Sequence, residues 1–210
     1  MVKGSKSSAH FLLKQRQRIL KLGKTLLFSG ALFFLSTSSA WSAGEPSALW
    51  AALRSGEHFV LIRHALAPGM GDPAEFTLGE CHTQRNLSAE GRAQAVRIGT
   101  LFRDNGIKSA KVFSSQWCRC LETADLLALG PVQELTPLNS FFSNFEDREP
   151  QTDQLREWLS GQSLKQPLVL VTHQVNIAAL TDIFPSSGEL VVVRRAATGE
   201  LLVVGTLETD

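Results

Sequence analysis

Three short apolar runs, each of which ends abruptly in polar residues, place the strongest constraint on how this chain folds. They cover residues 58–62, 111–114 and 168–172 and are rich in β-branched and aromatic side chains. A short, continuous apolar run is typical of a strand buried on both faces of a parallel sheet. Residues 189–195 and 201–207 predict two further strands, joined by a turn, at one edge of that sheet.

Helical patterns lie between the apolar runs. Ser88 is a capping residue that predicts a helix up to about residue 105. The predicted apolar face of this helix comprises Ala93, Val96, Leu101 and Phe102. Two more helices are expected, one over residues 120–128 and one that Gly161 ends, with a long polar loop over 139–151. Strands that alternate with helices predict an α/β fold, a three-layer α/β/α sandwich with a mostly parallel central sheet.

The N-terminal segment has the three parts of a secretory signal peptide. Residues 1–42 carry seven Lys and Arg and no acidic side chain, and an apolar core over 26–35 is followed by small residues. That core is about half of the roughly 20 residues that a membrane-spanning helix requires. We therefore expect export with cleavage after Ala40 or Ser42, and a single domain over 43–210 with no stable membrane anchor.

The rest of the chain is mildly acidic, although the whole sequence has a formal net charge of +1. Without the seven basic residues of the N-terminal segment, 14 Lys and Arg stand against 20 Asp and Glu, a formal charge of −6. A general nucleic-acid binder needs a basic surface to displace counterions from phosphates. The charge distribution argues against this class, so any phosphate group is bound locally.

The cysteines of the chain are Cys81, Cys118 and Cys120. Outside the cytosol, two of them are free to oxidise. A metal site is the rival interpretation, but it lacks a CxxC spacing and a second cluster of Cys or His. We therefore favour a disulfide between Cys81 and either Cys118 or Cys120, with the remaining thiol buried as a small side chain.

Charged and polar side chains follow the predicted strands. Arg63 and His64 come directly after the first strand, Ser115 after the second and His173 after the third, while Arg119 lies in the first turn of the next helix. Ligands of open α/β sheets collect beyond the carboxyl ends of the strands. The sequence therefore predicts one pocket that holds two arginines and two histidines.

This combination suits phosphoryl transfer. A transferred phosphoryl group spreads negative charge over three oxygens, which planar guanidinium groups bind bidentately. An imidazole with one unprotonated nitrogen is a competent nucleophile near neutral pH. The predicted chemistry is a phosphohistidine that water then hydrolyses.

Four stretches of the sequence resemble the histidine phosphatase superfamily, whose fold is phosphoglycerate-mutase-like. They occur in the family's order and are residues 61–65 (Leu-Ile-Arg-His-Ala), 86–95, 114–124 and 171–173. The resemblance implies that His64 is the phosphorylated nucleophile and that His173 completes the charged pocket. It also implies that Arg63 and Arg119 bind the phosphoryl oxygens, and it implies no metal or other cofactor.

Three features depart from the family's pattern. Ala65 and Gln174 each stand where relatives commonly have glycine, and Gln174 places a side chain near the pocket entrance. Many relatives also supply a glutamate that protonates the leaving oxygen, but here no acid directly follows Leu138. Either Glu146 or Asp147 reaches in from its loop, or the enzyme lacks a side-chain general acid.

The segment over residues 83–88 is where related enzymes often carry an arginine that contacts phosphate or substrate. We expect Arg85, Asn86 and Gln174 to bind the substrate, and an ordinary surface charge is the alternative for Arg85. The N-terminal segment, Cys81 and residues 83–88 look somewhat like the small periplasmic branch of the superfamily. That branch includes proteins assigned to dephosphorylating heptose in the lipopolysaccharide core.

The leading hypothesis is a periplasmic or secreted phosphomonoester hydrolase. Its expected partner is a small phosphate ester, such as a sugar phosphate, or a glycolipid phosphate of the cell envelope, and not nucleic acid. Two alternatives stay open. One is a binding protein for phosphate esters that has lost turnover, and the other is a phosphatase for activated substrates such as phosphohistidine, which need no acid.

Overall fold

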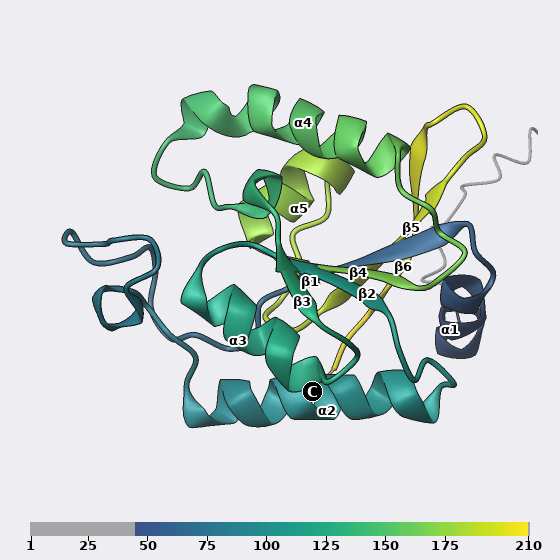
Figure 1. Cartoon of the computed structure of the whole chain (residues 1–210), viewed down its shortest axis with the longest axis horizontal. Coiled ribbons are helices and arrows are strands. Elements are labelled where there is room, and N and C mark those ends of the chain that lie inside the picture. The colour runs from purple at the N-terminus through teal and green to yellow at the C-terminus, as the bar shows by residue number, and fades with distance from the viewer. Residues whose placement is uncertain (1–44, 210) are drawn as a thin grey trace, which may run out of the picture. The chain divides into compact units, whose positions relative to one another are not determined.

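The computed structural model describes residues 45–209, in which helices cover both faces of a six-stranded sheet (Figure 1). The strands are β1 (His58–Arg63), β2 (Lys111–Ser114), β3 (Val132–Glu134), β4 (Leu168–Thr172), β5 (Leu190–Arg195) and β6 (Leu201–Leu207). The α-helices are α1 (Pro46–Arg54), α2 (Ala89–Asp104), α3 (Cys118–Leu127), α4 (Arg148–Ser160) and α5 (Gln174–Thr181). The predicted signal peptide, residues 1–42, lies outside the described residues. Within residues 45–209, no helix is both long and apolar enough to cross a membrane.

The order of the strands is β3-β2-β4-β1-β5-β6. The first four run parallel to one another, whereas β5 is antiparallel to β1 and β6 is antiparallel to β5. The predicted α/β sandwich with a mostly parallel sheet is therefore confirmed. The two late strands occupy one end of the sheet, with β6 at its edge.

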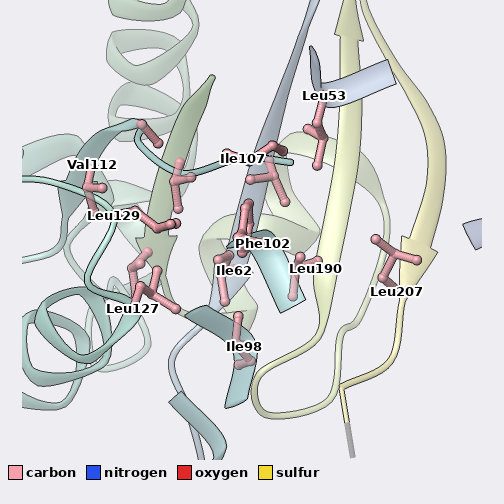
Figure 2. Close-up of a cluster of buried hydrophobic side chains, with 14 of the residues drawn as sticks. Leu53, Ile62, Ile98, Phe102, Ile107, Val112, Leu127, Leu129, Leu190 and Leu207 are labelled. Carbon is pink, nitrogen blue, oxygen red and sulfur yellow. The ribbon is translucent and has the colours of Figure 1, made fainter. Parts of the chain in front are cut away.

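Alternate residues of β1 face two separate cores. Val60 and Ile62 belong to the core that α1, α2 and α3 share with the sheet. Phe59 and Leu61 belong to the opposite core, beneath α4 and α5. Figure 2 shows the first core, where side chains from the sheet meet those of the helices. Because β1 is buried on both faces, its continuous apolar run is what a central parallel strand requires.

Helix α2 begins as predicted, but it buries a different face. The side chain of Ser88 accepts a hydrogen bond from the backbone N–H of Gly91 at 3.0 Å, as an N-cap does. The predicted apolar face is wrong at Ala93 and Val96, which are exposed. The buried face comprises Gly91, Gln94, Ala95, Ile98, Gly99 and Phe102.

Close approach of the backbone explains this difference. A Cβ atom on Gly91 would lie 2.0 Å from the backbone oxygen of Leu66, and one on Gly99 would lie 2.2 Å from the backbone oxygen of Leu127. Only glycine lets α2 pack so near the segment after β1 and the end of α3. Glycine carries no hydrophobic signal, so the pattern of apolar residues does not reveal this face.

The long loop predicted over residues 139–151 is shorter than expected, because α4 already begins at Arg148. Pro150 lies in the first turn of α4, where a missing backbone N–H removes no helical hydrogen bond. Helix α4 ends before Gly161, as predicted, whereas α5 was not predicted and begins directly after His173. Helix α5 therefore starts beside one of the two histidines that the sequence predicts for the pocket at the carboxyl edge of the sheet.

Candidate active site

Pairing of β1 with β4 brings the two predicted histidines together. The strands are parallel, and Arg63 at the end of β1 lies opposite Thr172 at the end of β4. The backbone N–H of His64 donates to the carbonyl oxygen of Thr172 at 2.9 Å. His64 and His173 therefore leave the sheet side by side, with ring centroids 5.6 Å apart.

A cavity of about 690 Å³ opens at this edge of the sheet. It is lined by the following predicted site residues: Arg63, His64, Arg85, Arg119, His173 and Gln174. The other predicted site residues, Asn86, Glu146 and Asp147, do not line it. The structure thus gathers the expected phosphoryl-binding residues in one place, while their individual roles stay predictions.

His64 is held as a neutral imidazole with one nitrogen free. The residue is 3% exposed, and its Nδ1 lies 2.8 Å from the backbone oxygen of Ala65. A carbonyl oxygen only accepts, so Nδ1 carries the proton and the lone pair is on Nε2. Burial, and after it the positive charge of Arg119, lowers the pKa of His64 to about 3. Nε2 is therefore unprotonated at neutral pH, as a nucleophile requires.

Arg63 and Arg119 each present a buried N–H group that no atom of residues 45–209 accepts. Nη1 of Arg63 donates to the backbone oxygen of Pro185 at 2.9 Å, and Arg119 is only 3% exposed. In the part of the chain that the structure describes, Nε of both arginines has no hydrogen-bond partner. An unpaired, buried guanidinium N–H is costly, and an oxygen of a bound anion removes that cost.

Asp72 balances part of this positive charge, and the sequence pattern did not single it out. Its carboxylate accepts hydrogen bonds from Nη1 and Nη2 of Arg119, at 2.6 and 3.1 Å. It also accepts from Nε1 of Trp117 at 3.0 Å and from the backbone N–H of Arg85 at 3.2 Å. Burial raises the pKa of this carboxyl, but the hydrogen bonds and the charge of Arg119 outweigh burial and lower the pKa overall.

The local sequence does not indicate a site role for Asp72, because Gly71-Asp72-Pro73 is typical of an ordinary turn. Charge balance is the signal that points to it. A pocket with three arginines and no acid would leave buried positive charge unpaired, so a carboxylate must lie nearby. Among the described residues that line the cavity, Asp72 alone carries a carboxylate.

His173 is fixed by contacts at both ring nitrogens. Its Nε2 lies 2.8 Å from Oγ of Ser115, the residue that follows β2, and that hydroxyl lies 3.3 Å from Oδ1 of Asn139. Its Nδ1 lies 3.5 Å from Nη2 of Arg119. Burial, and then the proximity of His64 and the arginines, holds the pKa of His173 well below its usual value. A bound phosphoryl dianion opposes this effect, because an opposite charge favours the protonated ring.

Arg85 lines the cavity and also braces the segment that follows β1. Its Nε donates to the backbone oxygen of Gly71 at 2.7 Å, and its Nη1 donates to the backbone oxygen of Ala67. Asn86, the next residue, does not line the cavity, and its Nδ2 donates hydrogen bonds to the backbone oxygens of Cys81 and Gln84. The structure therefore separates these two predicted substrate contacts.

Gln174 lies at the start of α5 and lines the cavity, as expected for a residue near the entrance. Its Nε2 donates to the backbone oxygen of Pro185 at 3.1 Å. The same oxygen accepts from Arg63. Gln174 thus shares an anchoring point with an arginine of the pocket.

Neither predicted acid reaches the cavity. Glu146 and Asp147 are exposed, and Oδ2 of Asp147 accepts a hydrogen bond from Nδ2 of Asn144 at 2.7 Å. Asn144 and Phe142 from the same segment do line the cavity. The segment therefore contributes amide and aromatic groups to the pocket wall, and its carboxylates remain outside.

A disulfide joins Cys81 to Cys118, one of the two pairings expected from the sequence. Cys118 is the first residue of α3 and directly precedes Arg119. Cys120 is a free thiol that is fully buried, and burial raises its pKa to about 12. It is therefore uncharged and occupies the core as a small side chain.

The low pKa values of His64 and His173 predict a loss of stability in acid. Between about pH 6.5 and its lowered folded-state pKa, each histidine binds a proton in the unfolded chain but not in the folded protein, so unfolding takes up protons in this range. Each group then lowers the free energy of unfolding by up to about 1.4 kcal/mol per pH unit as the pH falls. In urea titrations at pH 7.5 and 5.0, we expect His64→Gln to reduce the fall by roughly 2 kcal/mol.

The matched control is His82→Gln, because His82 is exposed and lies outside the cavity. This substitution should leave the fall in stability between pH 7.5 and 5.0 unchanged. An equal fall in the wild type and in His64→Gln would show that the folded protein does not hold His64 neutral.

Comparison with known proteins agrees with this geometry. Residues 59–167, more than half of the chain, match the family model of the histidine phosphatase superfamily (branch 1). No curated protein sequence gives a significant match.

Several solved structures share the fold at low sequence identity. The protein histidine phosphatase SixA, in a complex with tungstate, is 12% identical over 72% of this chain and 97% of its own, with a TM-score of 0.53. A mycobacterial glucosyl-3-phosphoglycerate phosphatase is 16% identical over 70% of this chain and 97% of its own, with a TM-score of 0.51. A variant of phosphoserine phosphatase from Entamoeba histolytica, in complex with phosphoserine, is 15% identical over 73% of this chain and 98% of its own, with a TM-score of 0.52.

The family match covers β1, which His64 directly follows, and α3, which carries Arg119. Within the described residues, the sheet brings His64 and Arg119 to the same cavity. This chain therefore belongs to the histidine phosphatase superfamily, branch 1, and is a phosphatase.

Proposed function

We propose that the protein is an exported phosphomonoester hydrolase that forms a phosphohistidine on His64. The observation that carries this proposal is the free Nε2 of a buried, neutral His64 in a cavity that also holds the unpaired Nε–H groups of Arg63 and Arg119. A nucleophile and two anion donors thus share one site. This is the minimum that transfer of a phosphoryl group to a histidine requires.

The reaction has two steps. In the first, Nε2 of His64 attacks phosphorus, the bond from phosphorus to the ester oxygen breaks, and the leaving oxygen takes a proton from solvent to depart as the alcohol. In the second, water attacks phosphohistidine, the P–N bond breaks, and inorganic phosphate leaves as His64 regains its lone pair. Arg63, Arg119 and His173 stabilise the charge on the phosphoryl oxygens in both steps.

The proposed substrate is a sugar phosphate or another small phosphomonoester of the cell envelope, including a glycolipid phosphate. A volume of about 690 Å³ leaves room for an organic group beside the phosphoryl group. Ser140, Asn144 and Gln174 supply polar side chains to the lining, and such groups suit the hydroxyls of a sugar. The solved relatives act on chemically diverse phosphate compounds, as their names state, which supports a small phosphorylated compound without selecting one.

A second candidate function is hydrolysis of an activated substrate such as phosphohistidine. The position of Glu146 and Asp147 outside the cavity favours it, because a good leaving group needs little help from an acid. Loss of turnover, with phosphate-ester binding retained, is the remaining alternative. Turnover of test substrates distinguishes all three.

Export is part of the proposal. It is supported by the sequence of residues 1–42 and by the disulfide between Cys81 and Cys118, which suits an oxidising compartment. When the full chain is expressed in a bacterium with two membranes, we expect a processed protein in the periplasmic extract. N-terminal sequencing should find a chain that begins at Trp41 or Ala43, and an unprocessed cytosolic protein would contradict export.

Substitution of the nucleophile tests the chemistry. We expect the wild type to release phosphate from p-nitrophenyl phosphate and His64→Ala to lose at least about 1,000-fold in kcat, as removal of a covalent nucleophile does. Phosphorylation of His64 after acid-free quenching with a labelled substrate should be lost in the same variant. Undiminished release from His64→Ala, or none from the wild type, would contradict a phosphohistidine mechanism.

The absence of Glu146 and Asp147 from the cavity predicts that neither acts as the general acid. Glu146→Gln and Asp147→Asn should retain kcat/KM within about twofold on both p-nitrophenyl phosphate and an alkyl phosphate. A true acid contributes about 10²–10⁴-fold for a poor leaving group and little for a good one. A loss confined to the alkyl phosphate in either variant would therefore identify that residue as the acid.

A further inference from the structure

The carboxylate of Asp72 accepts four hydrogen bonds, two of which come from the guanidinium group of Arg119. Both terminal nitrogens of Arg119 donate to it, at 2.6 and 3.1 Å. Trp117 and the backbone of Arg85 supply two further donors. The side chains of Arg119 and Asp72 are 3% and 14% exposed, so water competes little for this ion pair.

The pair leaves one edge of Arg119 unused. A guanidinium group has five N–H donors in a fixed fork, and each edge of the fork binds two oxygens side by side. Asp72 takes the edge formed by Nη1 and Nη2, whereas Nε is buried without a partner in the described part of the chain. Nη2 also lies 3.5 Å from Nδ1 of His173, so the edge formed by Nε and Nη2 borders the histidine.

From this geometry we propose that Asp72 is a positioning residue, which locks Arg119 by one edge so that the Nε–Nη2 edge binds the phosphoryl group. Asp72 keeps its contacts while the phosphoryl group is bound. The inference rests on the proposed function, because it assigns a second anion to the free edge of Arg119. The positioning role of Asp72 is additional to the roles proposed for the histidines and arginines of the pocket.

Two other roles for Asp72 fit the contacts less well. A general acid must hold a proton, but four donors converge on this carboxylate and stabilise its charged form. A mobile plug that leaves when phosphate arrives would have to give up all four of these hydrogen bonds, two of which come from Trp117 and the backbone of Arg85 and would not be replaced on Asp72 by the phosphate. A fixed carboxylate avoids both difficulties.

The fixed carboxylate also limits repulsion among the cations of the pocket. Arg63, Arg85 and Arg119 all line the cavity, and Asp72 is the one carboxylate among the described lining residues. Without it, Arg119 would keep its charge but lose the contacts that set its orientation. A misplaced donor of this kind lowers the rate by up to about 100-fold.

The test compares Asp72→Asn with Glu75→Gln, a charge-matched control in the same segment whose side chain is exposed and lies outside the cavity. We expect Asp72→Asn to lower kcat/KM by about 10- to 100-fold on aryl and alkyl phosphates alike. The affinity for orthophosphate, measured by calorimetry, should weaken in the same variant. Glu75→Gln should match the wild type in every measurement.

A double-mutant cycle separates positioning from a general effect on the fold. If Asp72 acts through Arg119, then Asp72→Asn has almost no further effect on kcat/KM in an Arg119→Ala background, whereas independent effects would multiply. If Asp72→Asn does not fold, Trp117→Phe removes one donor to the carboxylate. That variant should cause a smaller loss, which is again equal on both substrates.

Each of the other outcomes overturns the inference. A loss on alkyl phosphate alone would make Asp72 the general acid, and tighter binding of orthophosphate by Asp72→Asn would make it a competing plug. Behaviour identical to Glu75→Gln would leave it with no role in the site. Because orthophosphate binding needs no turnover, a wild type that binds phosphate without hydrolysing esters would contradict the proposed function and still test Asp72.

Discussion

The parallel pairing of β1 with β4 is the interaction on which the site depends. Its register places the last residue of one strand opposite the last residue of the other, so the histidine that follows each strand emerges at the same height. β2 lies on the other side of β4 and delivers Ser115 to His173. The placement of the pocket residues thus follows from backbone hydrogen bonds between strands.

Burial gives this arrangement its electrostatic character. The edge of the sheet is covered well enough that two imidazoles remain neutral and two guanidinium groups each keep an unsatisfied N–H. A low-polarity setting makes each unsatisfied donor expensive in the free protein and strengthens its attraction to an anion. The folded protein therefore contains destabilising, unpaired donors at the edge where we propose that the phosphoryl group binds.

Strand ends were predictable from the sequence because they combine a local apolar pattern with polar residues at fixed positions. His64 and His173 come at the ends of such strands, and the carboxyl ends of parallel strands meet at the same edge of a sheet. Asp72 was not predictable in this way, because a turn sequence carries no information about which distant arginine it meets. The buried face of α2 was missed for a related reason, since Gly91 and Gly99 act by allowing contact between backbones.

The disulfide between Cys81 and Cys118 links two segments of chain that both contribute to the pocket. Its second cysteine immediately precedes Arg119, and its first lies in the segment between Asp72 and Arg85. Oxidation of this pair therefore joins, by a covalent bond, the two stretches of chain that together provide the buried ion pair of the site. Assembly of the proposed anion site is in this way coupled to the thiol chemistry of the compartment in which the chain folds.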